Sequence, residues 1–358
     1  MNFLIPIAEL GNYLMFSFLV GHVALQFVSQ ENKPKIYLPK PALLLSTLGV
    51  IIFSLGPVIQ VIFYFKDSVG LNLATHSVLT DFQVGRAWIF IGFMATFLWM
   101  TLYVEGSKYL QALLLFLMIL AIGYSSHVAS LSFLTGTITH TIHFLVVTLW
   151  TGILIHVAWF AKEQPLWSKF LKWFTPLASI CLIVILVSGL FLMFFVVEPE
   201  DYVKAWVLPY GQMLLLKHIS IIPVLVFAFI NGVLAKRSLS NLSFNPLPWI
   251  KTESIFIFLI FYVTGILGTL SPPHEVEFTI KSEGASKLVE WLIGKDISSI
   301  LHLTINPSFH SIILITLSIL FLLLILASFK KVKPILAVLF GISYILAFYL
   351  GLMNTLNI

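Results

Sequence analysis

Runs of apolar residues, separated by short polar breaks, repeat along almost the whole chain. Each run is long enough for a helix to cross the roughly 30 Å hydrocarbon core of a bilayer. The runs predict ten membrane-spanning helices, at about 3–27, 42–65, 86–104, 109–126, 138–161, 172–196, 212–235, 252–271, 310–328 and 334–353. We therefore expect an all-α integral membrane protein, a bundle of about ten transmembrane helices.

The composition is also that of a membrane protein. Apolar residues make up 59% of the 358 residues and charged residues 10%, whereas soluble domains average roughly 45–50% and roughly 25%. No long polar linker separates the apolar runs, so residues 1–358 are expected to form a single polytopic membrane domain. Cys181 is the only cysteine, which excludes disulfides within the chain and paired-cysteine metal sites.

The positive charges alternate between loops. Lys and Arg accumulate in the cytoplasmic loops of membrane proteins, and thirteen of the 20 basic residues fall in every second loop here. These thirteen are Lys33, Lys35, Lys40, Lys108, Lys162, Lys169, Lys172, Lys236, Arg237, Lys251, Lys330, Lys331 and Lys333. The alternation predicts that both termini are external. It also explains the net charge of +5 through topology, so no nucleic-acid partner is expected.

The longest stretch outside the predicted helices covers residues 271–309, on the predicted external side. It contains Pro272 and Pro273 and an amphipathic piece at 288–292. Such a segment can lie on the membrane surface as a cap over the bundle. Two C-terminal helices, within residues 310–353, follow it.

Histidines gather on the predicted external side. Eight of the ten lie in external loops or at outer helix ends, and two, His22 and His156, fall toward the cytoplasmic side. The eight are His76, His127, His140, His143, His218, His274, His302 and His310. Neutral imidazole is a good ligand for copper, zinc, nickel and haem iron. The set therefore predicts a metal-capturing mouth, although histidine also tolerates membrane interfaces for purely structural reasons.

Five residues are the candidate metal ligands of this mouth. His140 and His143 are three positions apart on one predicted helix, so they could share one ion. His127 follows the preceding helix after a short connection, and His274 lies at the start of the long external loop. Glu9 lies about two turns inside the first helix, where an ionisable residue is costly and commonly marks an ion path.

Several motifs are absent from the sequence. It contains no Gly-rich phosphate loop, so ATP-driven pumping is not expected. Neither a His-Glu-x-x-His helix nor a Gly-x-Ser-x-Gly elbow occurs. We therefore do not expect a hydrolytic enzyme.

The region from about residue 80 to 275 resembles the CopD copper-resistance membrane family. The residues that carry the resemblance are Phe82-x-x-Gly85-Arg86-x-Trp88, Ser126-His127-x-Ala129, Ile142-His143 through Trp150-x-Gly152, Phe174-x-x-x-Ala178, Ser188-Gly189-Leu190, Tyr210-Gly211 through Lys217, Asn231, and Gly265-x-x-Gly268-x-x-Ser271-Pro272-Pro273. Their order and spacing make the resemblance more specific than any one of them alone.

The resemblance implies movement of a copper ion across the bacterial cytoplasmic membrane, usually uptake, with help from a small external copper-binding protein of the CopC type. No such domain is fused to this chain, so a separate protein or free copper would deliver the ion. His127 and His143 are the histidines that match the family pattern. The other candidates, His140, His274 and Glu9, come from the predicted topology.

Two other functions remain open. A related membrane superfamily includes haem-binding oxidoreductases, so the histidines could instead hold haem b in a membrane redox protein. The axial ligands would come from two helices, either His143 with His218 or His22 with His156. A third alternative is an assembly factor that receives a metal ion externally and passes it to another protein without transporting it.

Overall fold

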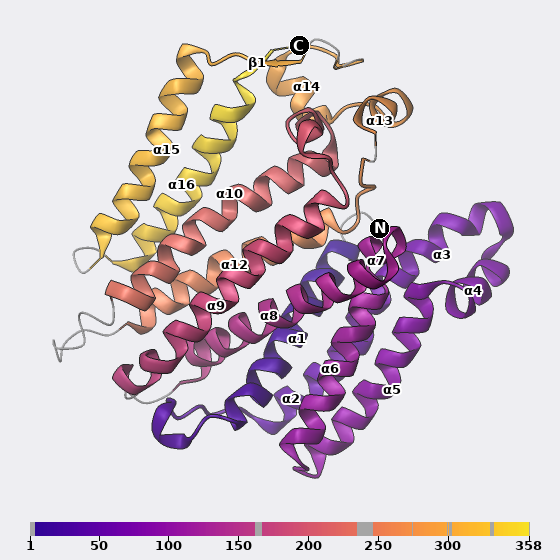
Figure 1. Ribbon diagram of the computed structural model, residues 1–358, viewed down its shortest axis with the longest axis vertical. Coiled ribbons are helices and arrows are strands. Elements are labelled where there is room, and N and C mark those ends of the chain that lie inside the picture. Colours follow the sequence, from indigo (N-terminus) through magenta and orange to yellow (C-terminus); the bar gives the residue numbers. More distant parts are fainter. Residues whose placement is uncertain are drawn as a thin grey trace. The chain divides into compact units, whose positions relative to one another are not determined.

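Figure 1 shows the computed structural model, which describes residues 4–161, 167–234, 246–273, 275–298, 300, 303–329 and 333–357. These residues fold almost entirely into helices. Nine helical segments within them are long and apolar enough to cross a membrane. The nine are Leu4–Gln26, Lys40–Val69, Gln83–Tyr103, Phe133–Phe160, Trp167–Phe194, Pro209–Val233, Leu247–Leu267, Phe309–Ser328 and Pro334–Met353.

Every predicted apolar run coincides with a helix. Nine runs correspond to the segments above, and the run at 109–126 corresponds to α6 (Lys108–Tyr124), an apolar helix of 17 residues. The all-α membrane class is therefore confirmed. The count of ten spans and the external position of both termini stay predictions.

The chain divides into two compact units, Met1–Phe195 and Val196–Ile358. The first unit consists of α1 (Leu4–Gln26), η1 (Gln30–Asn32), α2 (Lys40–Phe53), α3 (Leu55–Val69), α4 (Leu71–Thr80), α5 (Gln83–Tyr103), α6, α7 (His127–Leu131), α8 (Phe133–Phe160) and α9 (Trp167–Phe194). Serine side chains begin two of these helices. Ser107 accepts a hydrogen bond from the Tyr109 N–H at the start of α6, and Ser126 accepts one from the Ala129 N–H at the start of α7, which satisfies N–H groups that have no partner within the helix.

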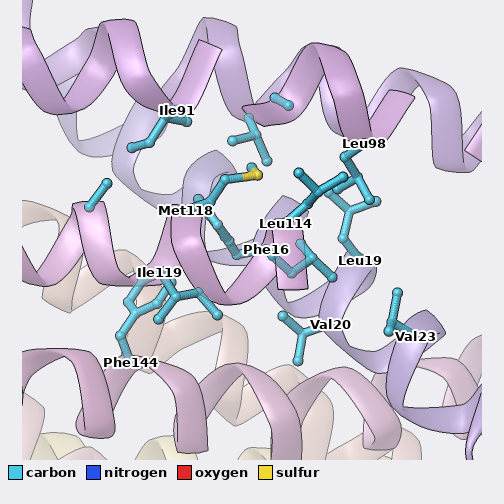
Figure 2. Close-up of a cluster of buried hydrophobic side chains, with 14 of the residues drawn as sticks. Phe16, Leu19, Val20, Val23, Ile91, Leu98, Leu114, Met118, Ile119 and Phe144 are labelled. Carbon is cyan, nitrogen blue, oxygen red and sulfur yellow. The ribbon is translucent and has the colours of Figure 1, made fainter. Parts of the chain in front are cut away.

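The core of the first unit lies where α1, α5 and α6 meet. Phe16 of α1, Met118 of α6 and Leu98 of α5 are fully buried there, and Figure 2 shows them directed toward one another. Phe144 of α8 joins them, because its ring meets that of Phe16 edge to face at 5.3 Å. This core fixes α1 and α8, the two helices that carry most of the candidate ligands.

Helix α4 was not among the predicted elements, because sequence analysis left residues 66–85 as a connection. Gly70 adopts a φ of 82°, which a side chain would strain, and it reverses the chain between α3 and α4. The ten residues of α4 are too few to cross a membrane. The helix therefore adds no span.

The second unit is built mainly from four long helices. Its elements are η2 (Pro199–Asp201), η3 (Lys204–Val207), α10 (Pro209–Phe229), the π-helical turn η4 (Ile230–Leu234), α12 (Leu247–Leu267), α13 (Val276–Glu283), α14 (Lys287–Ile293), β1 (Thr304–Ile305), α15 (Phe309–Ser328), α16 (Pro334–Met353) and β2 (Leu356–Asn357). Helices α15 and α16 pack against each other, and α10 packs on α12. Strands β1 and β2 form an antiparallel pair.

The predicted long loop, residues 271–309, contains the short helices α13 and α14 and strand β1. The amphipathic piece at 288–292 lies within α14. Val289 there is fully buried, whereas Trp291 is 76% exposed. One face of α14 therefore packs on protein and the other carries a large aromatic side chain outward, as expected of a surface helix.

Candidate functional site

Helices α1 and α8 touch at the level of their backbones. A Cβ atom added to Gly21 would lie 2.3 Å from the Gly152 carbonyl carbon, and one added to Gly152 would lie 2.1 Å from the Ser17 carbonyl oxygen. Only glycine permits so close an approach. The side chains pair in the same order along both helices, from Tyr13 with Phe144 to His22 with His156, so the two helices run in the same direction.

A buried hydrogen bond joins the two helices in the middle of this contact. The hydroxyl oxygens of Ser17 and Thr151 are 2.9 Å apart. The Thr151 hydroxyl donates to the Val147 carbonyl oxygen at 2.7 Å, so Ser17 is the donor in the contact between helices. Hydroxyl groups bonded across helices in this way stabilise membrane bundles and keep polar atoms satisfied inside hydrocarbon.

His156 of α8 is the most completely buried imidazole among the described residues, with 1% of its surface exposed. Its Nδ1 lies 2.8 Å from the Gly152 carbonyl oxygen. Because a carbonyl can only accept, Nδ1 carries the proton and Nε2 holds a lone pair. That Nε2 atom is buried and has no hydrogen-bond partner in the described part of the chain. A backbone carbonyl that fixes one ring nitrogen in this manner is typical of metal-ligating histidines.

His22 of α1 faces His156. Their ring centroids lie 6.4 Å apart with 33° between the planes. Two metal–nitrogen distances of about 2.0–2.1 Å plus the extent of the two rings add to roughly 6 Å, so this separation suits one ion held between them. Phe18 stacks on His156 with a centroid distance of 4.9 Å and gives that imidazole an apolar neighbour.

Two lysines lie at the C-terminal end of α1, beyond His22. The ammonium group of Lys33 donates to the Leu25 carbonyl oxygen at 2.5 Å, and that of Lys108 donates to the Gln26 carbonyl oxygen at 3.4 Å. Both bonds place a positive charge at the carbonyl groups that end the helix, where cations are favourable. Burial, together with the charge of Lys108, lowers the pKa of Lys33.

His140 and His143 contact different neighbours, although both lie in the N-terminal half of α8 and both are half-buried. His143 Nδ1 lies 2.9 Å from the Ser188 hydroxyl oxygen of α9. His140 stacks on Phe144, the ring that packs against α1. The three-residue spacing predicted one ion shared by the two imidazoles, and that sharing stays a prediction.

The remaining predicted ligands are spread over separate elements. His127 is the first residue of α7 and is exposed, and Glu9 is half-buried in α1. His274 lies outside the described residues. Within the described ranges, no three or more His, Cys, Asp or Glu side chains are grouped closely enough to hold a metal ion. A capture site at the predicted mouth would therefore need the ion itself, or His274, to bring these ligands together.

The other predicted histidines have separate surroundings. His218 of α10 forms a hydrogen bond of 2.7 Å between its Nδ1 and the Tyr202 hydroxyl. His76 of α4 and His310 of α15 are exposed. His302, like His274, lies outside the described residues.

The two predicted haem ligand pairs are placed differently in the structure. His143 belongs to the first unit and His218 to the second, and their pairing stays a prediction. The rings of His22 and His156 lie near each other, beside the backbone contact of Gly21 with Gly152. Haem ligation by this pair stays a prediction, as does the binding of a single ion.

A buried carboxyl group in the second unit was not singled out by sequence analysis. Glu253 of α12 is 2% exposed and accepts a hydrogen bond of 2.7 Å from the Asn231 amide nitrogen. Glu253 is only the second residue of the predicted helix at 252–271 and follows Lys251 of the predicted cytoplasmic loop, so the sequence did not place it inside a span. The helix begins earlier, at Leu247, and this places Glu253 within the candidate span.

Comparison with known families gives one match. Residues 168–267 match the family model described as copper resistance protein D. Comparison with curated proteins and with solved structures gives no match. The matched residues cover nearly all of α9 and the whole of α10, η4 and α12.

Proposed function

We propose that this membrane protein moves copper ions inward across the bacterial cytoplasmic membrane. Residues 168–267 match the model of the copper resistance protein D family. This match confirms the CopD resemblance over that part of the chain. The family match supports a membrane protein related to copper resistance. Uptake, and capture at a histidine-rich external mouth, are the specific parts of the proposal. A separate CopC-like protein or free copper would supply the ion.

One observation carries the proposal: α8 bears imidazoles at both of its ends. His140 and His143 lie in its first half, and His156 lies thirteen residues after His143, about 20 Å further along the helix. Glu9 and His22 occupy the corresponding parts of α1, which packs along α8. An ion that crosses the membrane along α1 and α8 would need ligands near both faces of the membrane, and these residues would supply them.

The two ends would have different roles. The outer residues His127, His140 and His143, with Glu9 and His274, would capture copper. The His22–His156 pair would receive it near the predicted cytoplasmic end. Two protein ligands hold an ion less firmly than three or four, and an ion in transit must be bound strongly enough to arrive yet weakly enough to leave.

The driving force would not be ATP, because no nucleotide-binding motif is present. A membrane potential supplies about 2.3 kcal/mol per unit charge per 100 mV to a cation that moves inward. The copper gradient or coupled protons could add to this. Inward movement is therefore energetically reasonable.

The test is copper uptake into sealed proteoliposomes that contain the full-length protein. The capture variant replaces His127, His140 and His143 with Ala, and the inner variant replaces His22 and His156. The control variant replaces the exposed His76 and His310 with Ala. We expect both test variants to lose at least about tenfold in uptake rate, since even the outer-shell partners of metal ligands matter that much. The control should retain the wild-type rate.

Three results would overturn parts of the proposal. Unchanged uptake in the capture variant would show that the proposed mouth is wrong. Copper bound by the wild-type protein without flux into vesicles would favour the assembly factor. A Soret absorption band in the purified protein, lost on replacement of His22 and His156, would favour the haem-binding redox protein.

A further inference from the structure

A carboxyl group that forms no ion pair with any described residue is buried in the second unit. Glu253 is the seventh residue of α12, so it lies about 9 Å inside this candidate span. Within the described ranges, its one hydrogen bond comes from the Asn231 side chain. None of the ion pairs among the described residues includes it. An isolated carboxylate in such surroundings is very costly, whereas a neutral carboxylic acid is not.

Asn231 has an unsatisfied atom beside this carboxyl group. Its amide nitrogen donates both to Glu253 Oε2, at 2.7 Å, and to the Trp249 carbonyl oxygen, at 3.2 Å. Its amide oxygen, Oδ1, is buried and has no donor among the residues that the structure describes. A carboxylate cannot satisfy this oxygen because it only accepts hydrogen bonds. A protonated Glu253 carries an O–H group that can.

The backbone around Asn231 departs from a regular α-helix. Residues Ile230–Leu234 form a π-helical turn directly after α10. Such turns are rare, and they occur frequently at functional sites. The bond to the Trp249 carbonyl oxygen gives Asn231 a second anchor when it is not bonded to Glu253.

Among the residues that the structure describes, no other titratable group is bonded to Glu253. On α12 itself, Lys251 is two positions away and so points to a different side of the helix. The titratable side chains of the packing helices are Tyr210, Lys217 and His218 on α10, and Tyr344 and Tyr349 on α16. Tyr349 donates a hydrogen bond to Gln212. Lys217 is fourteen residues before Asn231, which corresponds to about 20 Å along the helix axis. Protonation is thus the direct way to neutralise Glu253.

We propose that Glu253 is a proton-carrying site, with Asn231 as its positioning residue, and that its proton is exchanged as copper moves. In the resting state the Glu253 O–H group bonds to Asn231 Oδ1, which completes an acid–amide pair. When the pair opens, the O–H bond breaks and the proton passes to water, leaving the carboxylate. The coupling to copper rests on the proposed function, whereas the protonated state of Glu253 does not.

The protonated state can be tested by infrared spectroscopy of the full-length protein at neutral pH. The wild type should show the carbonyl stretch of a protonated carboxylic acid, which shifts in deuterated water. Glu253→Gln should lack this band and keep the wild-type unfolding temperature, because its amide group can also donate to Asn231 Oδ1. A parallel Glu9→Gln variant identifies any band from Glu9. Identical spectra for the wild type and Glu253→Gln would overturn the proposal.

The coupling is tested separately in proteoliposomes that enclose a pH-sensitive dye. In the wild type, we expect copper flux to change the internal pH and to respond to an imposed pH gradient. Glu253→Gln should lose both responses. A variant that keeps both would overturn the coupling. If the wild type moves no copper at all, the proposed function fails, while the infrared result still decides whether Glu253 holds a proton.

Discussion

The α1–α8 pair and the α10–α12 pair bury polar groups in opposite ways. Between α1 and α8, glycines bring the backbones into contact, and the Ser17 hydroxyl bonds directly to Thr151. Between α10 and α12, a π-helical turn interrupts the regular helix and an amide meets a carboxyl group. The first interface is close and regular, whereas the second contains a locally irregular backbone.

One buried atom in each pair, without a hydrogen-bond partner among the described residues, shows how the two differ in chemistry. His156 Nε2 is a nitrogen with a free lone pair, and Asn231 Oδ1 is a carbonyl oxygen that no donor reaches. A metal ion can satisfy the imidazole nitrogen, and a proton on the neighbouring carboxyl group can satisfy the amide oxygen. On the two proposals above, the ion site and the proton site would therefore lie on different helix pairs of one chain.

The largest expected effect concerns the closeness of α1 and α8. Gly21→Ala places a methyl group against the Gly152 backbone, so the helices must separate. We expect the free energy of unfolding to fall by about 1–3 kcal/mol and copper binding at His22 and His156 to weaken. Thermal unfolding in detergent measures the first effect, and copper titration measures the second.

The matched control is Gly92→Ala in α5, where an added Cβ has no neighbour within 4 Å. Alanine favours a helix over glycine by up to about 1 kcal/mol, so this variant should be unchanged or slightly more stable. Equal destabilisation by the two substitutions would contradict a special role for the Gly21 contact.

The next effect concerns the α10–α12 pair. Asn231→Ala removes the side chain that bonds to the buried Glu253 carboxyl group, which should cost about 1–3 kcal/mol of unfolding free energy. The double variant Asn231→Ala/Glu253→Leu removes both polar partners and should recover most of that loss. Chemical unfolding of the two variants measures the difference. If the double variant is less stable than Asn231→Ala, the loss of stability in Asn231→Ala does not come from leaving the Glu253 carboxyl group buried without a hydrogen bond.

The smallest effect concerns the hydrogen bond between α1 and α8. Ser17→Ala removes its donor, but Thr151 keeps its bond to the Val147 carbonyl oxygen. We expect a loss of about 0.6 kcal/mol, the average for such bonds in membrane helices. Unfolding measurements would check this value. A loss as large as that of Gly21→Ala would mean that hydrogen bonding, and not close packing, holds the two helices together.

The helices were largely predictable because the signal for them is local. A run of apolar residues is long enough to span a bilayer whatever its neighbours are, and every predicted run coincides with a helix. Helix α4 was missed because it is short and less apolar, and because it depends on the backbone turn at Gly70. The helix depends on the positive φ of Gly70, and a hydropathy pattern carries no information about backbone angles.

The candidate site was predictable only in part. Sequence analysis identified His22 and His156 as a pair, and the structure brings them face to face. It did not identify the Gly152 carbonyl that fixes the His156 ring, because that contact depends on the rotamer of a buried side chain. The partnership of Asn231 with Glu253 joins two helices separated in sequence, so it required the packed structure.

The contact between Gly21 and Gly152 also limits how this protein could change conformation. Two helices whose backbones touch cannot easily slide or rotate against each other, since packed interfaces have discrete arrangements. The separation between the rings of His22 and His156, which lie on the two different helices, is then held constant. Alternating access, if the protein uses it, would have to come from the helices that pack around α1 and α8.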